Sequence, residues 1–155
     1  MNKIAAIALF SLFSMSCNES KQKENTESNT KSETIRHDHE MDSHGMELNK
    51  GSKWKADSST NNNVNSIIAL IETFKTGNDK SIQAYQQTVA GLEAGLNKMI
   101  RECRMQGPDH DALHKWLEPL INGVKDLKQS TTEENAAVAW GKIEAQVHLY
   151  DQYFE

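Results

Sequence analysis

From residue 58 to the end of the chain, apolar residues recur every three or four positions. This spacing lines one face of a helix and predicts four amphipathic helices, with breaks at residues 77–79, 107–108 and 130–132. Pro119 lies inside the third segment and predicts a kink there. Short connections between such helices favour an all-α fold, an antiparallel four-helix bundle that spans residues 48–155.

Capping residues support the predicted helix ends. The stretch from Ser58 to Thr60 comes just before the first stripe, Asp79 comes before the second, and Ser130 opens a Ser-Thr-Thr-Glu sequence typical of a capping box. Residues 48–54 are expected to form an extended strap that lays Trp54 on the helices. The predicted stripes consist of Val64, Ile67, Ile68, Ile71 and Phe74; Ile82, Tyr85, Val89, Leu92, Leu96, Met99 and Cys103; His110, Leu113, Leu117, Leu120, Val124 and Leu127; and Ala136, Trp140, Ile143, Val147, Tyr150 and Phe154.

The first sixteen residues have the pattern of an export signal. Lys3 precedes the apolar stretch 4–13, which is too short to span a bilayer, so residues 1–16 are interpreted as a cleaved signal peptide. Ser14-Met-Ser16 before Cys17 resembles the lipobox of bacterial lipoproteins. It implies that Cys17 is acylated and anchors the chain in a lipid bilayer. An ordinary secretory signal is the alternative. Asn18 is compatible with delivery to the outer membrane, so the expected location is the cell envelope, with the helical domain outside the cytoplasm.

Residues 17–47 are expected to form a tether. No apolar residue occurs between residues 18 and 34, and such a stretch cannot bury enough surface to become ordered. Near the end of the tether, histidine and methionine are concentrated at His37, His39, Met41, His44 and Met46. Tracts of this kind bind copper or zinc weakly without a fold, and a solvated polar linker is the alternative.

Sulfur and imidazole side chains also gather around the break between the second and third helices. Cys103 and Met105 precede it, and His110 and His114 follow it, four residues apart and therefore on one side of a helix. In an antiparallel pair these side chains are expected to meet at one end of the bundle. The set suits Cu(I), and also Zn(II) if Met105 is left out. The alternatives are core packing for Cys103, a place over the end of the bundle for Met105, a cap or a hydrogen bond to the turn for His110, and an ion pair for His114.

Three stretches carry a resemblance to a known family: residues 48–55, a hairpin motif, and the closing Tyr150-x-x-Tyr153-Phe154. The motif reads Cys103-x-Met105-x-Gly107-x-x-His110-Asp111-x-Leu113-His114-x-Trp116-Leu117-x-Pro119. Together they resemble a family of small helical bacterial envelope lipoproteins over about residues 48–155. The resemblance implies a helical envelope protein, suggests a link to copper or other heavy metals, and implies no catalytic residue.

The charge balance and the absence of known catalytic motifs limit the functions that the sequence suggests. The chain has 17 Lys and Arg against 22 Asp and Glu, a balance that argues against nucleic acid as a partner. It has no Gly-rich phosphate loop, HExxH or CxxCH motif, so it is not expected to be an enzyme. Two hypotheses remain. The first is a metal-binding lipoprotein that serves as a copper or zinc buffer, sensor or carrier. The second is a metal-free helical module that binds another envelope protein.

Overall fold

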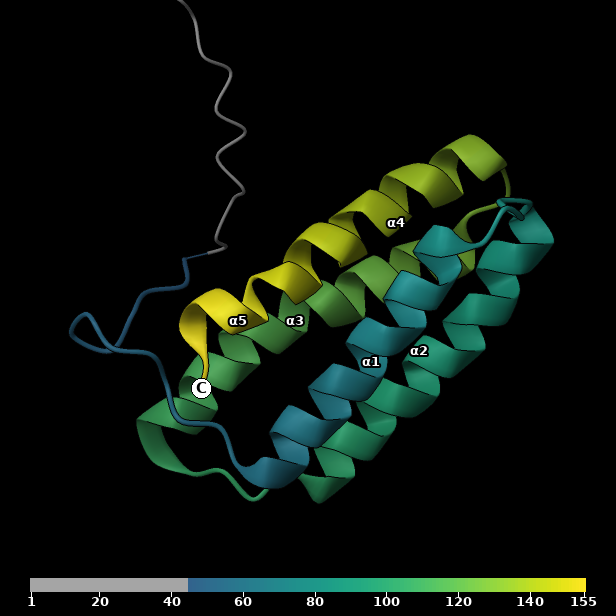
Figure 1. The fold of residues 1–155 in the computed structure, drawn as a ribbon. Helices are drawn as coiled ribbons and strands as arrows, with labels where there is room; N and C mark the ends of the chain where they lie inside the picture. Colours follow the sequence, from purple (N-terminus) through teal and green to yellow (C-terminus); the bar gives the residue numbers. More distant parts are fainter. Residues whose placement is uncertain (1–44) are drawn as a thin grey trace, which may run out of the picture. The chain divides into compact units, whose positions relative to one another are not determined.

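The computed structural model describes residues 45–155. The predicted signal peptide, Cys17 and the tether up to residue 44 lie outside this range. The described part is all-helical, as predicted, and its β-structure is limited to two isolated bridges. Across these residues, every helix is too short or too polar to traverse a lipid bilayer. The helices, drawn in Figure 1, are α1 (Ser58–Thr76), α2 (Ile82–Glu102), α3 (Gly107–Gln129), α4 (Glu133–His148) and α5 (Tyr150–Tyr153).

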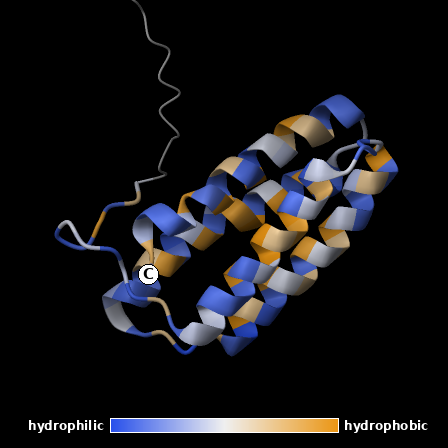
Figure 2. Cartoon of the chain, viewed as in Figure 1, coloured by the Kyte–Doolittle hydropathy of each residue, from blue (hydrophilic) through white to orange (hydrophobic). Residues whose placement is uncertain are grey.

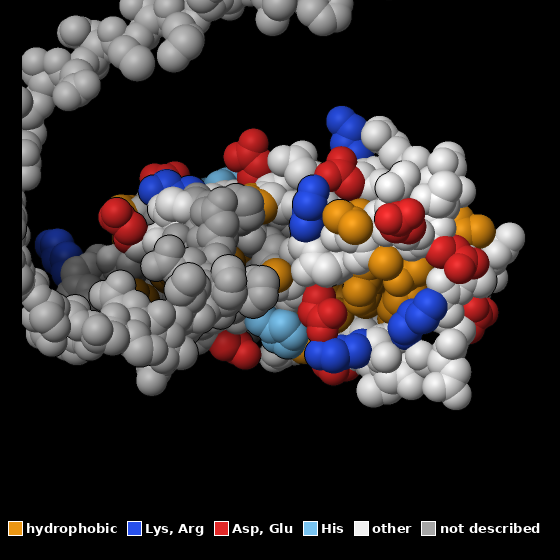
Figure 3. Space-filling view, turned by 90° about the horizontal axis from the view of Figure 1, so that it is seen from above, with side chains coloured by type: hydrophobic (Ala, Val, Ile, Leu, Met, Phe, Trp, Pro, Cys, Tyr) orange, Lys and Arg blue, Asp and Glu red, His pale blue; other side chains and the backbone are white. Residues whose placement is uncertain are grey.

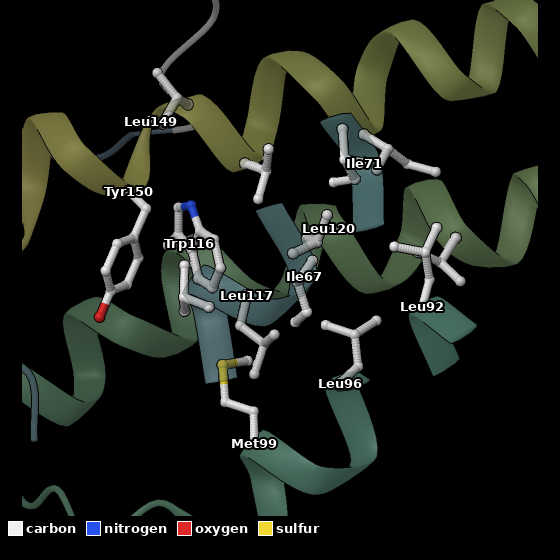
Figure 4. Packing of buried hydrophobic residues seen from close by; sticks show 14 of the residues in the cluster. Ile67, Ile71, Leu92, Leu96, Met99, Trp116, Leu117, Leu120, Leu149 and Tyr150 are labelled. Atoms are coloured by element: carbon white, nitrogen blue, oxygen red, sulfur yellow. The ribbon is translucent and has the colours of Figure 1, made fainter. Parts of the chain in front are cut away.

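The four long helices lie side by side, and consecutive helices run in opposite directions (Figure 1). Hydropathy along the ribbons shows apolar residues interleaved with polar ones on each helix (Figure 2). Ile67, Leu92 and Leu120 are examples of buried residues that come from three different helices and meet in one core (Figure 4). Most of the predicted stripe residues are buried in this way. Those that are only partly buried are Ile68, Phe74, Ile82, Cys103 and His110.

Glycines allow close approach within two of the helix pairs. A Cβ atom at Gly95 of α2 would lie 3.0 Å from the Ile67 side chain of α1. At Gly123 of α3 it would lie 2.9 Å from the Ile143 side chain of α4. Because interiors are close-packed, a larger residue at either position would force the helices or their side chains to shift.

The helix caps differ from the predicted ones. Asp57 caps α1, and its carboxylate accepts a hydrogen bond from a first-turn N–H at 2.6 Å. Ser81 caps α2, while Asp79 accepts a hydrogen bond from the Ser81 N–H. Thr132 caps α4, and Ser130 instead ends α3. The predicted caps were therefore wrong, because only the residue directly before the first helical position has a backbone that lets its oxygen reach the N–H groups of the first turn.

Residues 46–57 form an irregular strap that leads into α1 and pairs with the chain's C-terminal end. The Trp54 N–H donates to the Tyr153 carbonyl at 2.8 Å, and the Glu155 N–H donates to the Trp54 carbonyl at 3.0 Å. The Trp54 side chain is partly buried and packs against the core, as expected. Met46 is only 4% exposed and belongs to the core. The packed region therefore begins before residue 48, within the segment that was predicted to be tether.

A reciprocal hydrogen-bonded pair joins α3 to α4 inside the core. The Trp116 indole N–H donates to the backbone carbonyl of Gln146 at 2.9 Å, and the Gln146 amide donates to the Trp116 carbonyl at 2.7 Å. Both residues are buried. Pro119 lies one turn further on, and α3 continues through it as one helix. Since proline has no N–H, it breaks the regular helical hydrogen bonding next to this pair.

Candidate metal-binding residues

Four residues, 103–106, connect α2 to α3. Gly107 is the first residue of α3 and has a positive φ of 64°, a conformation that glycine adopts without strain. Pro108 lies in the first turn of the helix, where its missing N–H costs nothing. The prediction that the chain turns at these two residues was therefore wrong. They begin α3, and residues 103–106 cross from α2 to α3. In Figure 1 the start of α3 lies beyond the end of α2.

Polar contacts show how α2 and α3 lie side by side. The Glu93 carboxylate lies 2.8 Å from the Lys128 ammonium, and the Gln86 amide donates to the carbonyls of Leu127 and Ser130. The last turns of α3 therefore lie beside the first half of α2.

The two histidines of α3 come together as expected. The rings of His110 and His114 lie with their centroids 4.5 Å apart and their planes at 80°, an edge-to-face arrangement. His110 is half-buried and His114 is exposed. The four-residue spacing therefore presents two imidazoles at the surface, one turn apart on a regular helix.

The two sulfur residues pack against the core. Cys103 is the C-cap of α2, and both Cys103 and Met105 are partly buried. The residues on either side of Cys103 bond to the start of α1: the Glu102 carbonyl accepts from the Ser59 hydroxyl at 2.9 Å, and the Arg104 N–H donates to Asp57 at 2.7 Å. The thiol is thus near the start of α1.

Cys103 does not join both imidazoles in one cluster. Across residues 45–155, three Cys, His, Asp or Glu ligand atoms all lie within 4.8 Å of one another only at Glu72, Glu144 and His148. The expected convergence of the thiol with His110 and His114 is therefore not found in this part of the chain. Cys103 is the C-cap of α2, whereas both imidazoles belong to the first turns of α3.

The cluster of Glu72, Glu144 and His148 was missed by sequence reasoning. Glu144 and His148 are one turn apart in α4, and the His148 Nε2 atom lies 3.8 Å from a carboxylate oxygen of Glu72 in α1. The four-residue spacing in α4 was visible in the sequence. Its partner in α1 was not, because no sequence pattern relates positions on two distant helices.

The predicted capture tract lies mostly outside the described residues, which exclude His37, His39, Met41 and His44. Met46 is described, and its side chain is buried in the core. Its assignment as a loose metal ligand is therefore corrected, since a thioether packed in the core is not free to bind an ion.

An apolar groove of about 460 Å³ separates α2 from α3. Ile100 and Ile121 line it and are 52% and 38% exposed, among the most exposed large apolar side chains of the described region. Glu93, Lys125 and Lys128 contribute charge to its lining. The groove therefore combines apolar walls with charges of both signs.

On the face seen in Figure 3, acidic and basic side chains are interspersed with hydrophobic ones.

No protein-family model, no curated protein and no solved structure matches this chain.

Proposed function

We propose that this protein is a lipid-anchored envelope protein that binds copper or zinc as a buffer, sensor or carrier. In this proposal residues 1–16 are a cleaved signal peptide, acylated Cys17 holds the chain in a bacterial membrane, with the outer membrane favoured, and the helices form an antiparallel four-helix bundle outside the cytoplasm. The support for the anchor is the export-type sequence that ends in Ser16-Cys17.

The observation that carries the metal proposal is the pair of imidazoles on α3, with ring centroids 4.5 Å apart. Two histidines one turn apart on a helix are a recurrent metal-binding arrangement, because both rings can turn toward one ion. His110 and His114 also adjoin the 103–106 connection, which carries Cys103 and Met105. For one of these sulfur atoms to complete the site, the connection would have to leave the conformation in which the Arg104 N–H donates to Asp57. Imidazole with sulfur suits Cu(I).

The tract of His37, His39, Met41 and His44 acts in this proposal as a capture arm. It precedes the packed strap directly in the sequence, and its ligands are those that bind copper and zinc without a preformed site. It would collect an ion and pass it to the histidine pair.

A titration of the chain from residue 18 onward with Cu(I), and separately with Zn(II), tests the fixed site. We expect one ion to bind more tightly than micromolar, and His110→Ala and His114→Ala each to weaken it about tenfold or more. Asn122→Ala, also on the exposed side of α3, is the matched control and should bind as the parent does. Cys103→Ser and Met105→Leu then identify the sulfur ligand. If neither ion binds more tightly than micromolar, the fixed site does not exist.

One observation favours a second candidate, a metal-free module that binds another envelope protein. The exposed Ile100 and Ile121 side chains share the α2–α3 groove, as an interaction surface requires. A photo-crosslinking residue at position 100 should then yield one adduct in intact cells, and Ile121→Lys should abolish it. Random or absent adducts would reject this candidate.

A further inference from the structure

α1 and α4 are joined by side chains over the last turns of α1. The Phe74 and Trp140 rings pack with their centroids 4.3 Å apart. Beside them, the Lys75 ammonium pairs with the Glu144 carboxylate at 2.5 Å, and the His148 Nε2 atom lies 3.8 Å from a Glu72 oxygen. The polar edge of this interface therefore contains two carboxylates, one imidazole and one ammonium.

The carboxylates and the imidazole are arranged so that they could hold one ion. One ligand atom from each of Glu72, Glu144 and His148 lies within 4.8 Å of the other two. Ligand atoms at about 2.0–2.2 Å from a tetrahedral Zn²⁺ are themselves separated by about 3.3–3.6 Å. Closing the remaining gap of about 1 Å requires only side-chain rotation, since all three residues are partly or fully exposed and stand on regular helices.

A positive charge is already stabilised at this place. The hydrogen bond to Glu144 raises the pKa of Lys75, and the negative charges of Glu144 and Glu72 raise it further, so both carboxylates act on the same cation. His148 is also the last residue of α4, where the unpaired carbonyl groups of a helix end favour cations. A metal ion would take over the carboxylates, and the half-exposed Lys75 side chain would turn to solvent.

We propose that Glu72, Glu144 and His148 form a metal site that binds a borderline divalent ion, with Zn²⁺ as the best fit, and ties α1 to α4. Two oxygen ligands and one nitrogen ligand suit Zn²⁺ and disfavour Cu(I), which prefers sulfur. Water completes the coordination at this exposed position. The site shares no ligand with the histidine pair of α3, so either can exist without the other.

Zinc titration of the chain from residue 18 onward, followed by calorimetry and by thermal unfolding, tests the site. Zinc should bind and raise the Tm, because it binds the folded chain and links two helices. His148→Ala and Glu144→Gln should each weaken zinc binding about tenfold or more and remove the rise in Tm. Glu134→Gln removes a carboxylate elsewhere on α4 and is the control for the lost charge.

Lys75→Gln should strengthen zinc binding, in contrast to the substitutions of the ligands. Without the competing ammonium, zinc should bind about two- to fivefold more tightly, as expected for one exposed charge pair. Lys142→Gln removes a lysine of α4 that lies 3.9 Å from Asp126 of α3, away from the cluster, and should change the affinity less. An equal gain in both variants would mean that only net charge matters, and would overturn the site.

His148 itself gives a readout that does not depend on stability. Saturating zinc should shift the ring nitrogen resonances of His148 and leave those of His114 unchanged. If the α3 pair binds copper, Cu(I) should shift the His114 resonances and leave those of His148 unchanged. His114→Ala should retain the zinc-dependent rise in Tm. Unshifted His148 resonances, or a rise in Tm that persists in His148→Ala, would overturn the α1–α4 site without touching the proposal for α3.

Discussion

The Asp57 carboxylate joins two segments of the described chain, the start of α1 and the α2–α3 connection. Its Oδ1 atom accepts hydrogen bonds from the Thr60 N–H at 2.6 Å and the Ser59 hydroxyl at 2.8 Å, and its Oδ2 atom accepts one from the Arg104 N–H at 2.7 Å. Burial raises the pKa of this carboxyl, but the hydrogen bonds outweigh burial and lower the pKa from 3.8 to about 2. The start of α1 is thereby fastened to the connection between α2 and α3.

Replacing Asp57 with Ala should lower the free energy of unfolding by about 1–2 kcal/mol at neutral pH, the usual cost of losing an N-cap. Because the folded pKa lies below the unfolded value of 3.8, the carboxylate's contribution is complete above pH 3.8 and is lost as the pH falls toward about 2. Urea unfolding of both proteins at several pH values measures this. The difference should shrink on acidification, and a constant difference would contradict the assigned role.

Gln146 is the second residue whose role depends on burial. In Gln146→Leu the Trp116 carbonyl would lose its side-chain donor in a water-free environment, so the free energy of unfolding should fall by about 1–3 kcal/mol. Urea unfolding provides the measurement. Gln83→Leu, at an exposed position of α2, is the matched control and should change stability by less than about 0.5 kcal/mol. Similar losses in the two variants would show that the pair contributes nothing specific.

At the scale of the helices, two glycines give opposite predictions for the same substitution. Gly141 of α4 is exposed, and a Cβ there meets nothing within 4 Å, so Gly141→Ala should stabilise the protein by about 0.5–1 kcal/mol through helix propensity. Gly123→Ala gains the same propensity but drives a methyl group against the fully buried Ile143. Overpacking costs about 1–3 kcal/mol, so the net effect should be a loss. Thermal unfolding of both variants measures these effects. If both substitutions stabilise the protein, α3 and α4 do not approach as closely at Gly123 as described.

Helices were the most predictable elements. The steps of three and four residues placed all four long helices, since this periodicity arises within one segment and needs no partner. Their exact ends were less predictable. Asp57, Ser81 and Thr132 cap helices at positions where several neighbouring polar residues were equally suitable by type. The choice among them depends on where packing lets the chain leave the helix.

At the scale of the whole described unit, the strap ties the beginning of the helical region to its end. Trp54 pairs with the C-terminal residues through its backbone, and its indole N–H donates to the Glu47 carbonyl at 2.7 Å. Met46, at the beginning of the strap, is buried in the core. The strap therefore couples residues that precede α1 to those that follow α4.

Trp54→Ala should release this coupling. We expect faster amide hydrogen exchange at Ala56 and Glu155, whose N–H groups bond across the strap, while amides in the middle of α2 and α3 keep their protection. Exchange measured by NMR distinguishes local release from global loss of stability. Uniformly faster exchange in α2 and α3 would show that the strap is part of the global folding unit.

Local spacing along the chain was enough to predict the all-helical class, the core stripes and the pairing of His110 with His114, because each depends on residues within a turn or two of one another. The contacts between helices were not accessible in this way. Cys103, His110 and His114 are near in sequence, yet their ligand atoms do not form one cluster in the described residues. Glu72 and His148 are far apart in sequence, yet packing brings them within 3.8 Å. Relative register depends on loop conformation and on how buried side chains fit together, and these are properties of the folded chain as a whole.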